Sequence, residues 1–298
     1  MKRVFVIILM LATVLSLIGC TGDTFYPSIV EINGVNKIED GRLGTMSKDY
    51  FVGVAEGDIT DHTSWSKYGY LAASSGSFQT VWEVGGQYVF PVAAQGMEVR
   101  SSSVEDDPLK VDGITVGTGV HSVKIWYLTN TFIEKTETIT LNGTANVNTV
   151  NTDIYRVNYF QIATAGTGQA AAGLIDIRNK TDHTTVYSRI SIGYTRARST
   201  IYTVPATDKA LYITDVSLSC AYSSAGKSVR FIGQSTFSEL NNALVSFFVP
   251  FMEVMLVDNV YAKQLTIPHK FPTGTDLKFT VIGEANAQCT VVMRGWIE

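Results

Sequence analysis

The sequence is poor in the residues that most enzymatic and metal chemistry requires. Its 298 residues include three cysteines, four histidines and seven prolines, and charged residues make up only 17%. No C-x-x-C pair occurs and no histidine lies at ligand spacing from another, which argues against a zinc or redox site. The net charge is −4, with both signs mixed along the chain, so the electrostatic footprint of a nucleic-acid-binding protein is missing. We therefore expect no nucleic-acid partner and no cofactor.

The chain has one apolar run of the kind that directs a protein to a membrane, and this run lies at the N-terminus. A basic start is followed by an unbroken apolar stretch from Val4 to Ile18, and then by Gly19 and Cys20. This order is typical of a bacterial export signal, and residues 17–20 resemble the lipobox of bacterial lipoproteins, in which Cys20 is lipidated. The run is shorter than the roughly 20 residues that span a bilayer. A membrane is expected as a partner only if Cys20 is lipidated.

From residue 97 onward the pattern indicates strands. Short runs rich in β-branched and aromatic residues are separated by Gly, Asn, Ser and Thr turns. Residues Thr136 to Leu141 alternate cleanly, and Asn142-Gly143 then supplies a turn whose residues tolerate positive φ. The best helical candidate is short, from Phe237 to Leu244. We predict an all-β chain with one or two antiparallel, jelly-roll-like β-sandwich domains behind an irregular N-terminal arm.

Changes in composition divide the chain into five parts. They are a signal-like segment (1–20), a linker (21–45), an aromatic, loop-rich arm (46–96), and two β-sandwich domains (97–185 and 186–298). We expect the folded unit to begin near Met46. The arm either lies over its own domain or docks on a neighbouring subunit through aromatic anchors, since such residues dominate binding energy. The anchors would be Trp65, Trp82 and Tyr88.

Several segments resemble one family, the structural proteins of marine tailed phages. They are residues 46–70 (MSKDYFVGVAEGDITDHTSWSKYGY), 81–86 (VWEVGG), 137–144 (ETITLNGT) and 201–205 (IYTVP). The resemblance covers about 250 residues from Met46 onward, and its motifs are structural. It implies a virion component of β-sandwich architecture that assembles as an oligomer with other virion proteins. Residues 1–45 depart from this pattern, which keeps a lipoprotein open as the alternative.

Two groups of polar residues are candidate sites. The densest acidic group is Glu105, Asp106 and Asp107, whose oxygens could bind a hard cation, although a solvated turn is the better interpretation. Tyr194, Arg196 and Arg198 alternate and would share one strand face. That face is either solvated or a contact for a glycan or another subunit.

The two cysteines beyond Cys20 are expected to be buried thiols. Cys220 and Cys289 both lie in strand-like runs, where a free cysteine behaves as a small hydrophobe. An exported protein could instead join them in a disulfide.

Residues Leu244 to Val257 (LVSFFVPFMEVMLV) form the most apolar stretch outside the signal. One interpretation is a pair of buried core strands interrupted at Pro250. The other is a strand or hairpin whose outer face is covered by another copy, because large apolar patches are uncommon on monomers. The assembly contacts would then be Phe247, Phe248, Phe251 and Met252.

The first interpretation of function is a non-enzymatic virion structural protein that acts by oligomeric assembly. The alternative is a bacterial surface lipoprotein with a β-sandwich module that binds a ligand or glycan. A polysaccharide-active enzyme is the third, since separated carboxylates can form an acid–base pair in space.

Overall fold

The computed structural model describes residues 38–39, 42–43, 50–110, 113–208, 210–222, 227–257, 260–283 and 286–298. The chain divides into two units, residues 1–63 and 64–298. Cys20, the signal-like segment, most of the 21–45 linker and the expected start at Met46 lie outside the described residues.

Three short elements occur among the described residues of the first unit. Strands β1 (Ile38–Glu39) and β2 (Arg42–Leu43) pair antiparallel, and helix α2 spans Tyr50–Glu56. The helix ends at Gly57, whose φ of 79° is a left-handed conformation that favours glycine. The N–H of Asp58 then donates to the carbonyl of Gly53 at 2.9 Å, which satisfies one of the last helical acceptors.

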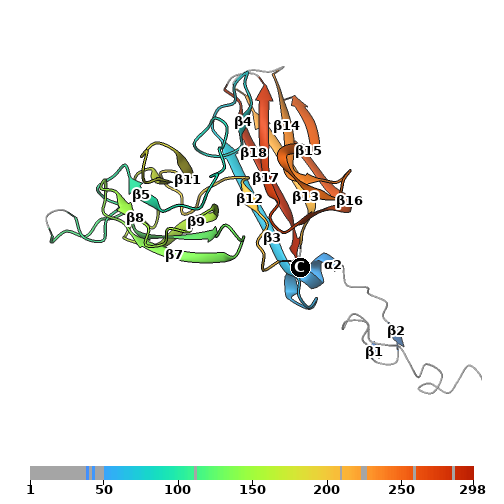
Figure 1. Cartoon of the computed structure of the whole chain (residues 1–298), viewed down its shortest axis with the longest axis horizontal. Coiled ribbons are helices and arrows are strands. Elements are labelled where there is room, and N and C mark those ends of the chain that lie inside the picture. Colours follow the sequence, from blue (N-terminus) through green and yellow to red (C-terminus); the bar gives the residue numbers. More distant parts are fainter. Residues whose placement is uncertain are drawn as a thin grey trace, which may run out of the picture. The chain divides into compact units, whose positions relative to one another are not determined.

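The second unit consists of two antiparallel β-sandwiches, so the predicted all-β, β-sandwich fold class is confirmed (Figure 1). The first sandwich packs the sheet β11-β10-β5-β8 against the sheet β7-β6-β9. Its strands are β5 (Met97–Ser101), β6 (Val120–Leu128), β7 (Glu134–Thr140), β8 (Val147–Asn148), β9 (Arg156–Ala165), β10 (Ile175–Asn179) and β11 (Val186–Ile190).

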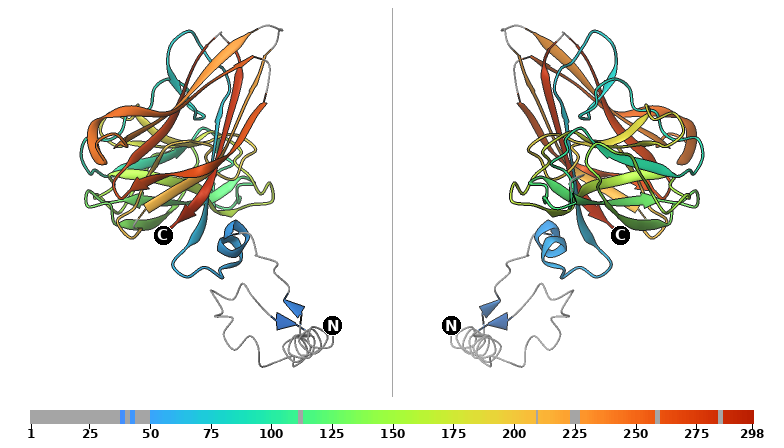
Figure 2. Two further views of the ribbon diagram at one scale, coloured as in Figure 1. Left: turned by 90° about the vertical axis from the view of Figure 1, so that its right-hand side faces the viewer. Right: turned by 90° about the vertical axis from the view of Figure 1, so that its left-hand side faces the viewer.

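The second sandwich packs the sheet β12-β17-β14-β15, with β4 beside β17, against the sheet β16-β13-β18-β3. The orange and red strands of this sandwich lie beside the green strands of the first in Figure 1 and overlap them in the two side views of Figure 2. Its strands are β3 (Thr63–Leu71), β4 (Gln79–Thr80), β12 (Tyr202–Thr203), β13 (Ala210–Ala221), β14 (Ser228–Ser238), β15 (Ala243–Val257), β16 (Val260–Pro272), β17 (Asp276–Gly283) and β18 (Gln288–Ile297).

Side chains at every second strand position fill each core. In β6, Val123, Ile125 and Tyr127 are fully buried on one face and belong to the first core, as expected for side chains that alternate across a strand. In the second core, β18 approaches β13 so closely at Gly295 that a Cβ atom there would collide with the carbonyl of Tyr212. Glycine is therefore required where the pairing of these two strands shifts register.

The domain boundaries differ from those expected. Strand β11, residues 186–190, pairs with β10 and so belongs to the first sandwich, which moves the boundary beyond residue 185. Strands β3 and β4, from the expected arm, are strands of the second sandwich. Long-range pairing between strands decides this assignment, and composition does not encode such pairing.

The three expected anchors of the arm lie inside the chain's own cores. Trp65 is 5% exposed in the second core, and Trp82 and Tyr88 are 5% and 4% exposed in the first. Trp82 meets Tyr88 edge to face at 5.1 Å, and its ring nitrogen donates to the carbonyl of Gly85 at 2.9 Å. The expectation that these aromatics dock on a neighbouring subunit is therefore wrong, and the other interpretation, an arm packed on its own domain, holds.

The expected helix from Phe237 to Leu244 is also wrong. Strand β14 continues to Ser238 and β15 begins at Ala243, so the segment is a hairpin turn. Asn242 adopts a φ of 48°, a left-handed conformation that asparagine tolerates and that hairpin turns require. Pairing along the long β14–β15 ladder outweighs a short helical pattern.

Candidate functional site: an exposed apolar sheet edge

Strand β15 forms the open edge of its sheet. It pairs with β14 on one side, and the sheet order places no described strand on its other side. At about 3.3 Å per residue, its 15 residues extend over roughly 50 Å. A long edge leaves a row of backbone donors and acceptors that another strand can pair with, and natural proteins usually protect such edges with charges or a covering segment.

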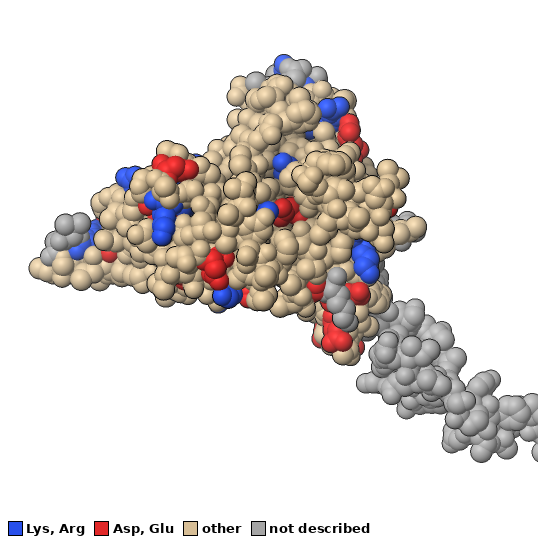
Figure 3. Space-filling model, viewed as in Figure 1, with Lys and Arg blue, Asp and Glu red and all other residues tan. Residues whose placement is uncertain are grey.

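The side chains at this edge are apolar and exposed. Exposed fractions are 51% for Leu244, 62% for Phe247, 64% for Met255 and 53% for Val257. The one charged residue in β15, Glu253, lies 3.4 Å from the guanidinium of Arg230 on β14. Figure 3 shows few charged side chains along the margin of the second sandwich where β15 and β16 lie.

The rest of β15 packs against its own chain. The ring of Phe251 meets those of Phe271 and Phe279 at 5.1 and 5.8 Å, and Met252 packs against the same core. Phe248 lies on the opposite face, 5.4 Å from the ring of Phe90, with the ammonium of Lys278 at 4.1 Å from its centroid. Of the four expected assembly contacts, only Phe247 faces outward.

The stretch from Leu244 to Val257 is one continuous strand, so the expectation of a pair of buried core strands is wrong. Pro250 does not interrupt it: the residue is paired in register with Gln234 and is exposed. Proline is tolerated at a sheet edge because its missing N–H can face away from the neighbouring strand. The proline also limits how far a further strand could pair along this edge.

A hollow lies beside the start of β15. It has a volume of about 420 Å³ and lies between the β14–β15 turn and β16. Its walls include Phe237, Ile267 and Pro268, and its rim carries Glu239 bound to His269 at 2.8 Å. Ile267 is 82% exposed, and Leu240 in the adjoining turn is 98% exposed. We call Leu240, Leu244, Phe247, Ile267, Met255, Val257 and this hollow the β15 edge surface.

The acidic group at residues 105–107 is engaged internally. The carboxylate of Asp106 is fully buried and accepts hydrogen bonds from the Ser101 hydroxyl and three backbone N–H groups, at 2.6 to 2.9 Å. Glu105 binds Lys110 at 2.5 Å, which lowers the pKa of its carboxyl. The backbone N–H of Leu109 donates to Asp107. The solvated turn expected for this group is therefore wrong for Asp106, and no group of three potential metal ligands occurs in the described part of the chain.

Tyr194, Arg196 and Arg198 do not share a strand face, because residues 194–199 form an extended connection without regular strand structure. Arg198 binds Glu83 with nitrogen–oxygen distances of 2.6 and 2.8 Å, and the two side chains are 10% and 2% exposed. Its guanidinium lies over the rings of Tyr194 and Tyr70 at 3.5 and 4.3 Å. Arg198 is thus bound within its own chain and is not a solvent-facing contact. Arg196 instead lines a separate pocket.

A polar seam joins the two sandwiches, and sequence reasoning missed it. Arg156 on β9 binds Asp276 on β17 through two nitrogen–oxygen contacts of 2.9 Å, and Asn158 exchanges two hydrogen bonds with the backbone of Thr203. Lys67 on β3 donates to the carbonyl of Asn158. The partners are 45 to 120 residues apart in sequence, so no local pattern could have paired them.

The expectation of buried thiols is confirmed. Cys220 and Cys289 are thiols buried in the second core and not joined in a disulfide, and they face each other in the β13–β18 register. The pKa of the Cys289 thiol is raised to about 12, mainly because the thiol is buried and to a lesser extent because of the neighbouring Cys220.

Within the described residues, no helix has the length and apolar character needed to cross a membrane. No protein-family model matches the chain, and no curated protein matches it. Among solved structures, it was aligned with infectious bursal disease virus of the Gx strain (10% identity, 80% of this chain, 77% of that chain, TM-score 0.17) and with T=1 particles derived from that virus (11%, 80%, 74%, 0.16). The alignment with the VP2 subviral particle of infectious bursal disease virus has 10% sequence identity, covers 80% of this chain and 76% of that chain, and has a TM-score of 0.15. TM-scores this low do not establish a shared fold, so these likenesses carry no argument about the chain.

Proposed function

We propose that this chain is a non-enzymatic structural protein that assembles through the β15 edge surface, as a component of a phage particle. The observation that carries the proposal is the open, 15-residue, apolar edge of the second sandwich. Exposed apolar side chains and unpaired backbone groups at one edge favour covering by another chain. Catalysis would require groups held ready to react, and the acidic and cationic candidates at residues 105–107 and 198 are instead bound internally.

A second copy of this chain is the occupant we assign to the edge. The surface carries both an aromatic projection, Phe247, and the hollow beside the start of β15, whose apolar wall includes Ile267. A patch that holds a projection and a cavity side by side can bind the same patch of another copy across a two-fold axis. Anchors seated in pockets dominate the energy of such interfaces. Phe247 of one copy would enter the hollow of the other.

The placement in a virion rests on the resemblance of residues from Met46 onward to structural proteins of marine tailed phages. It implies other virion proteins as further partners. The alternative, a membrane-anchored lipoprotein with a β-sandwich binding module, rests on Cys20. Mass spectrometry of the mature N-terminus separates the two: a lipidated Cys20 favours the lipoprotein, and an N-terminus near Met46 favours the virion protein.

The assembly proposal is tested by sedimentation velocity over a range of protein concentrations. We expect the wild type to associate in the micromolar range, and Phe247→Lys and Ile267→Lys to weaken association at least about tenfold, because each buries an ammonium in an apolar contact. Val150→Lys is the matched control, since Val150 is 88% exposed in the first sandwich.

Circular dichroism melting should give the same midpoint for all three variants as for the wild type. A wild type that stays monomeric throughout the micromolar range, or edge variants that associate like Val150→Lys, would refute the assembly proposal.

A further inference from the structure

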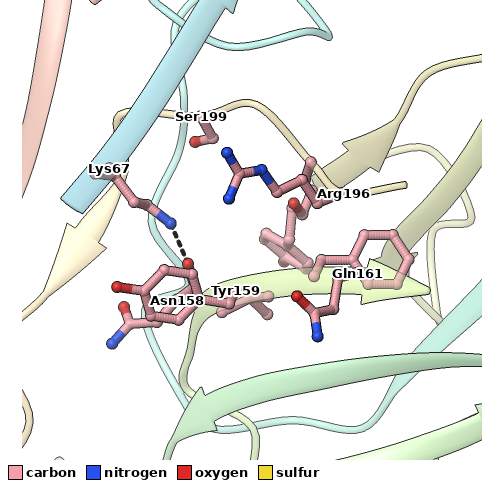
Figure 4. Close-up of a pocket in the computed structure, with 11 residues that line it drawn as sticks. Lys67, Asn158, Tyr159, Gln161, Arg196 and Ser199 are labelled. Carbon is pink, nitrogen blue, oxygen red and sulfur yellow. Dashed lines mark hydrogen bonds between the residues drawn. The ribbon is translucent and has the colours of Figure 1, made fainter. Parts of the chain in front are cut away.

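A small pocket in the second unit brings together two cationic side chains. Lys67 reaches it from β3 and Arg196 from the extended connection that follows β11, and residues of β9 and β11 complete its walls. Figure 4 shows the Arg196 guanidinium turned toward the side of the pocket on which Lys67 and Ser199 lie, with the Lys67 ammonium directed at the carbonyl of Asn158. The pocket has a volume of about 60 Å³, and a single water needs roughly 10–15 Å³. It therefore admits a few water-sized groups and excludes a nucleotide or a sugar.

Lys67 is buried without a carboxylate. The residue is 8% exposed, and its ammonium donates to the carbonyl of Asn158 and lies 4.2 Å from the centroid of the Tyr159 ring. The pKa of Lys67 is lowered to about 7, mainly because the ammonium is buried and to a lesser extent because Arg196 carries a like charge. A buried cation is usually paired with an anion, and an ammonium has three donors, of which one is used by Asn158.

Arg196 lacks the carboxylate partner that most described arginines of the sandwiches have. Four of these bind a carboxylate at 2.9 Å or less: Arg156 with Asp276, Arg178 with Glu98, Arg189 with Asp176 and Arg198 with Glu83. Among the described residues, no carboxylate lies within ion-pair distance of Arg196 or Lys67. Glu83 contacts this connection at Arg198, and its carboxylate already accepts from the backbone N–H and the guanidinium of that residue.

We infer that this pocket binds a small inorganic oxyanion between Lys67 and Arg196. A guanidinium presents two parallel donors to an oxyanion, and an ammonium adds a point charge. The Ser199 hydroxyl already accepts from the N–H of Ile201 and keeps its own proton free to donate. The anion would supply the charge that both cations lack. Because Lys67 belongs to the second sandwich and Arg196 follows the first, it would also tie the two sandwiches together beside the polar seam.

The probe is inorganic sulfate, whose charge is constant over the range in which Lys67 titrates. Calorimetric titration should give saturable binding to the wild type, and Arg196→Gln should weaken it roughly 10- to 100-fold, as expected for the loss of a charge-assisted contact. Arg196 is exposed at the mouth of the pocket, so this variant should fold. Arg100, which is also exposed and lies in the first sandwich, gives the matched control: Arg100→Gln should bind sulfate like the wild type.

A second readout uses pH and thermal melting. The groups around Lys67 are Arg196 and the rings of Tyr159 and Tyr202; Tyr187 also lines the pocket, while Glu134 and Asp208 act on the two rings. Sulfate affinity should fall between about pH 6 and pH 8.5 as Lys67 loses its proton. Sulfate also stabilises proteins generally, so the informative quantity is the shift of the wild type minus that of Arg196→Gln.

Three results would overturn the inference. The first is no saturable binding of sulfate, and the second is equal affinity in the wild type and Arg196→Gln. The third is loss of self-association in Arg196→Gln without any sulfate binding, which would mean that a partner's carboxylate occupies the pocket. Phe247→Lys should keep sulfate binding, so failure of this inference is distinguishable from failure of the assembly proposal.

Discussion

The guanidinium of Arg156 and the carboxylate of Asp276 join the two sandwiches through a bidentate pair, with side chains only 8% and 11% exposed. Arg156 also donates to the carbonyl of Pro91 at 2.7 Å, and Asp276 accepts from the Thr203 hydroxyl. Both ions therefore have further hydrogen bonds, as a buried ion pair needs if its attraction is to offset the loss of hydration. The pair fixes how β9 of one sandwich meets β17 of the other.

Removing one partner of this pair should destabilise the protein strongly. Arg156→Met leaves the Asp276 carboxylate buried and unpaired, which costs about 3–5 kcal/mol and lowers the melting midpoint by on the order of 10 °C. Lys135→Met is the control: Lys135 and Asp153 form a pair whose side chains are 47% and 41% exposed, and such pairs contribute about 0–1 kcal/mol. Equal melting midpoints for the two variants would show that Arg156 is not a structural link.

The buried Asp106 carboxylate should be equally sensitive. Asp106→Asn keeps the shape of the side chain but replaces an acceptor oxygen with an NH₂ group, which faces backbone N–H donors. Each buried donor left unsatisfied costs roughly 1–3 kcal/mol, so the free energy of unfolding should fall by several kcal/mol. Denaturant titration measures it. An unchanged midpoint, with stability that depends on added calcium, would revive the cation site.

The thiols of Cys220 and Cys289 should resist alkylation in the native protein. The thiolate is the reactive form, and with the Cys289 pKa at about 12 almost none is present near pH 8. Mass spectrometry after iodoacetamide treatment without reductant should find both cysteines unmodified when folded and both modified in denaturant. A linked Cys220–Cys289 peptide would contradict the prediction and favour an exported protein, since the two residues are register partners.

Lys67 gives a pH dependence of stability with a defined sign. The folded pKa is about 7 and the usual value is 10.5, so between these limits the unfolded chain binds more protons. Unfolding free energy should therefore rise with pH in that window, by at most about 1.4 kcal/mol per pH unit. Denaturant titrations of the wild type and Lys67→Met, in chloride buffers, should diverge from pH 7 upward. Parallel profiles would show that Lys67 does not titrate in this window.

The sequence by itself determined the all-β fold class and the apolar character of the strand from Leu244 to Val257. Two-residue alternation with β-branched residues predicts antiparallel sandwiches, because one face of each strand must be buried. The lack of alternation between Leu244 and Val257 predicts a strand that is apolar on both faces. The positions of Cys220 and Cys289 beside apolar neighbours likewise predict burial. These inferences need only local pattern.

Tertiary structure decided which strands meet and which polar groups pair. The turn at Asn242 brings β15 beside β14, and the order of the strands in the sheet leaves β15 at the edge. The sheet order places Val186–Ile190 in the first sandwich, and packing buries the arm aromatics such as Trp82. The same holds for the pairing of Arg156 with Asp276 and for the approach of Arg196 to Lys67. Each depends on contacts between residues far apart in sequence, and such contacts follow from the register of whole sheets and not from any local pattern.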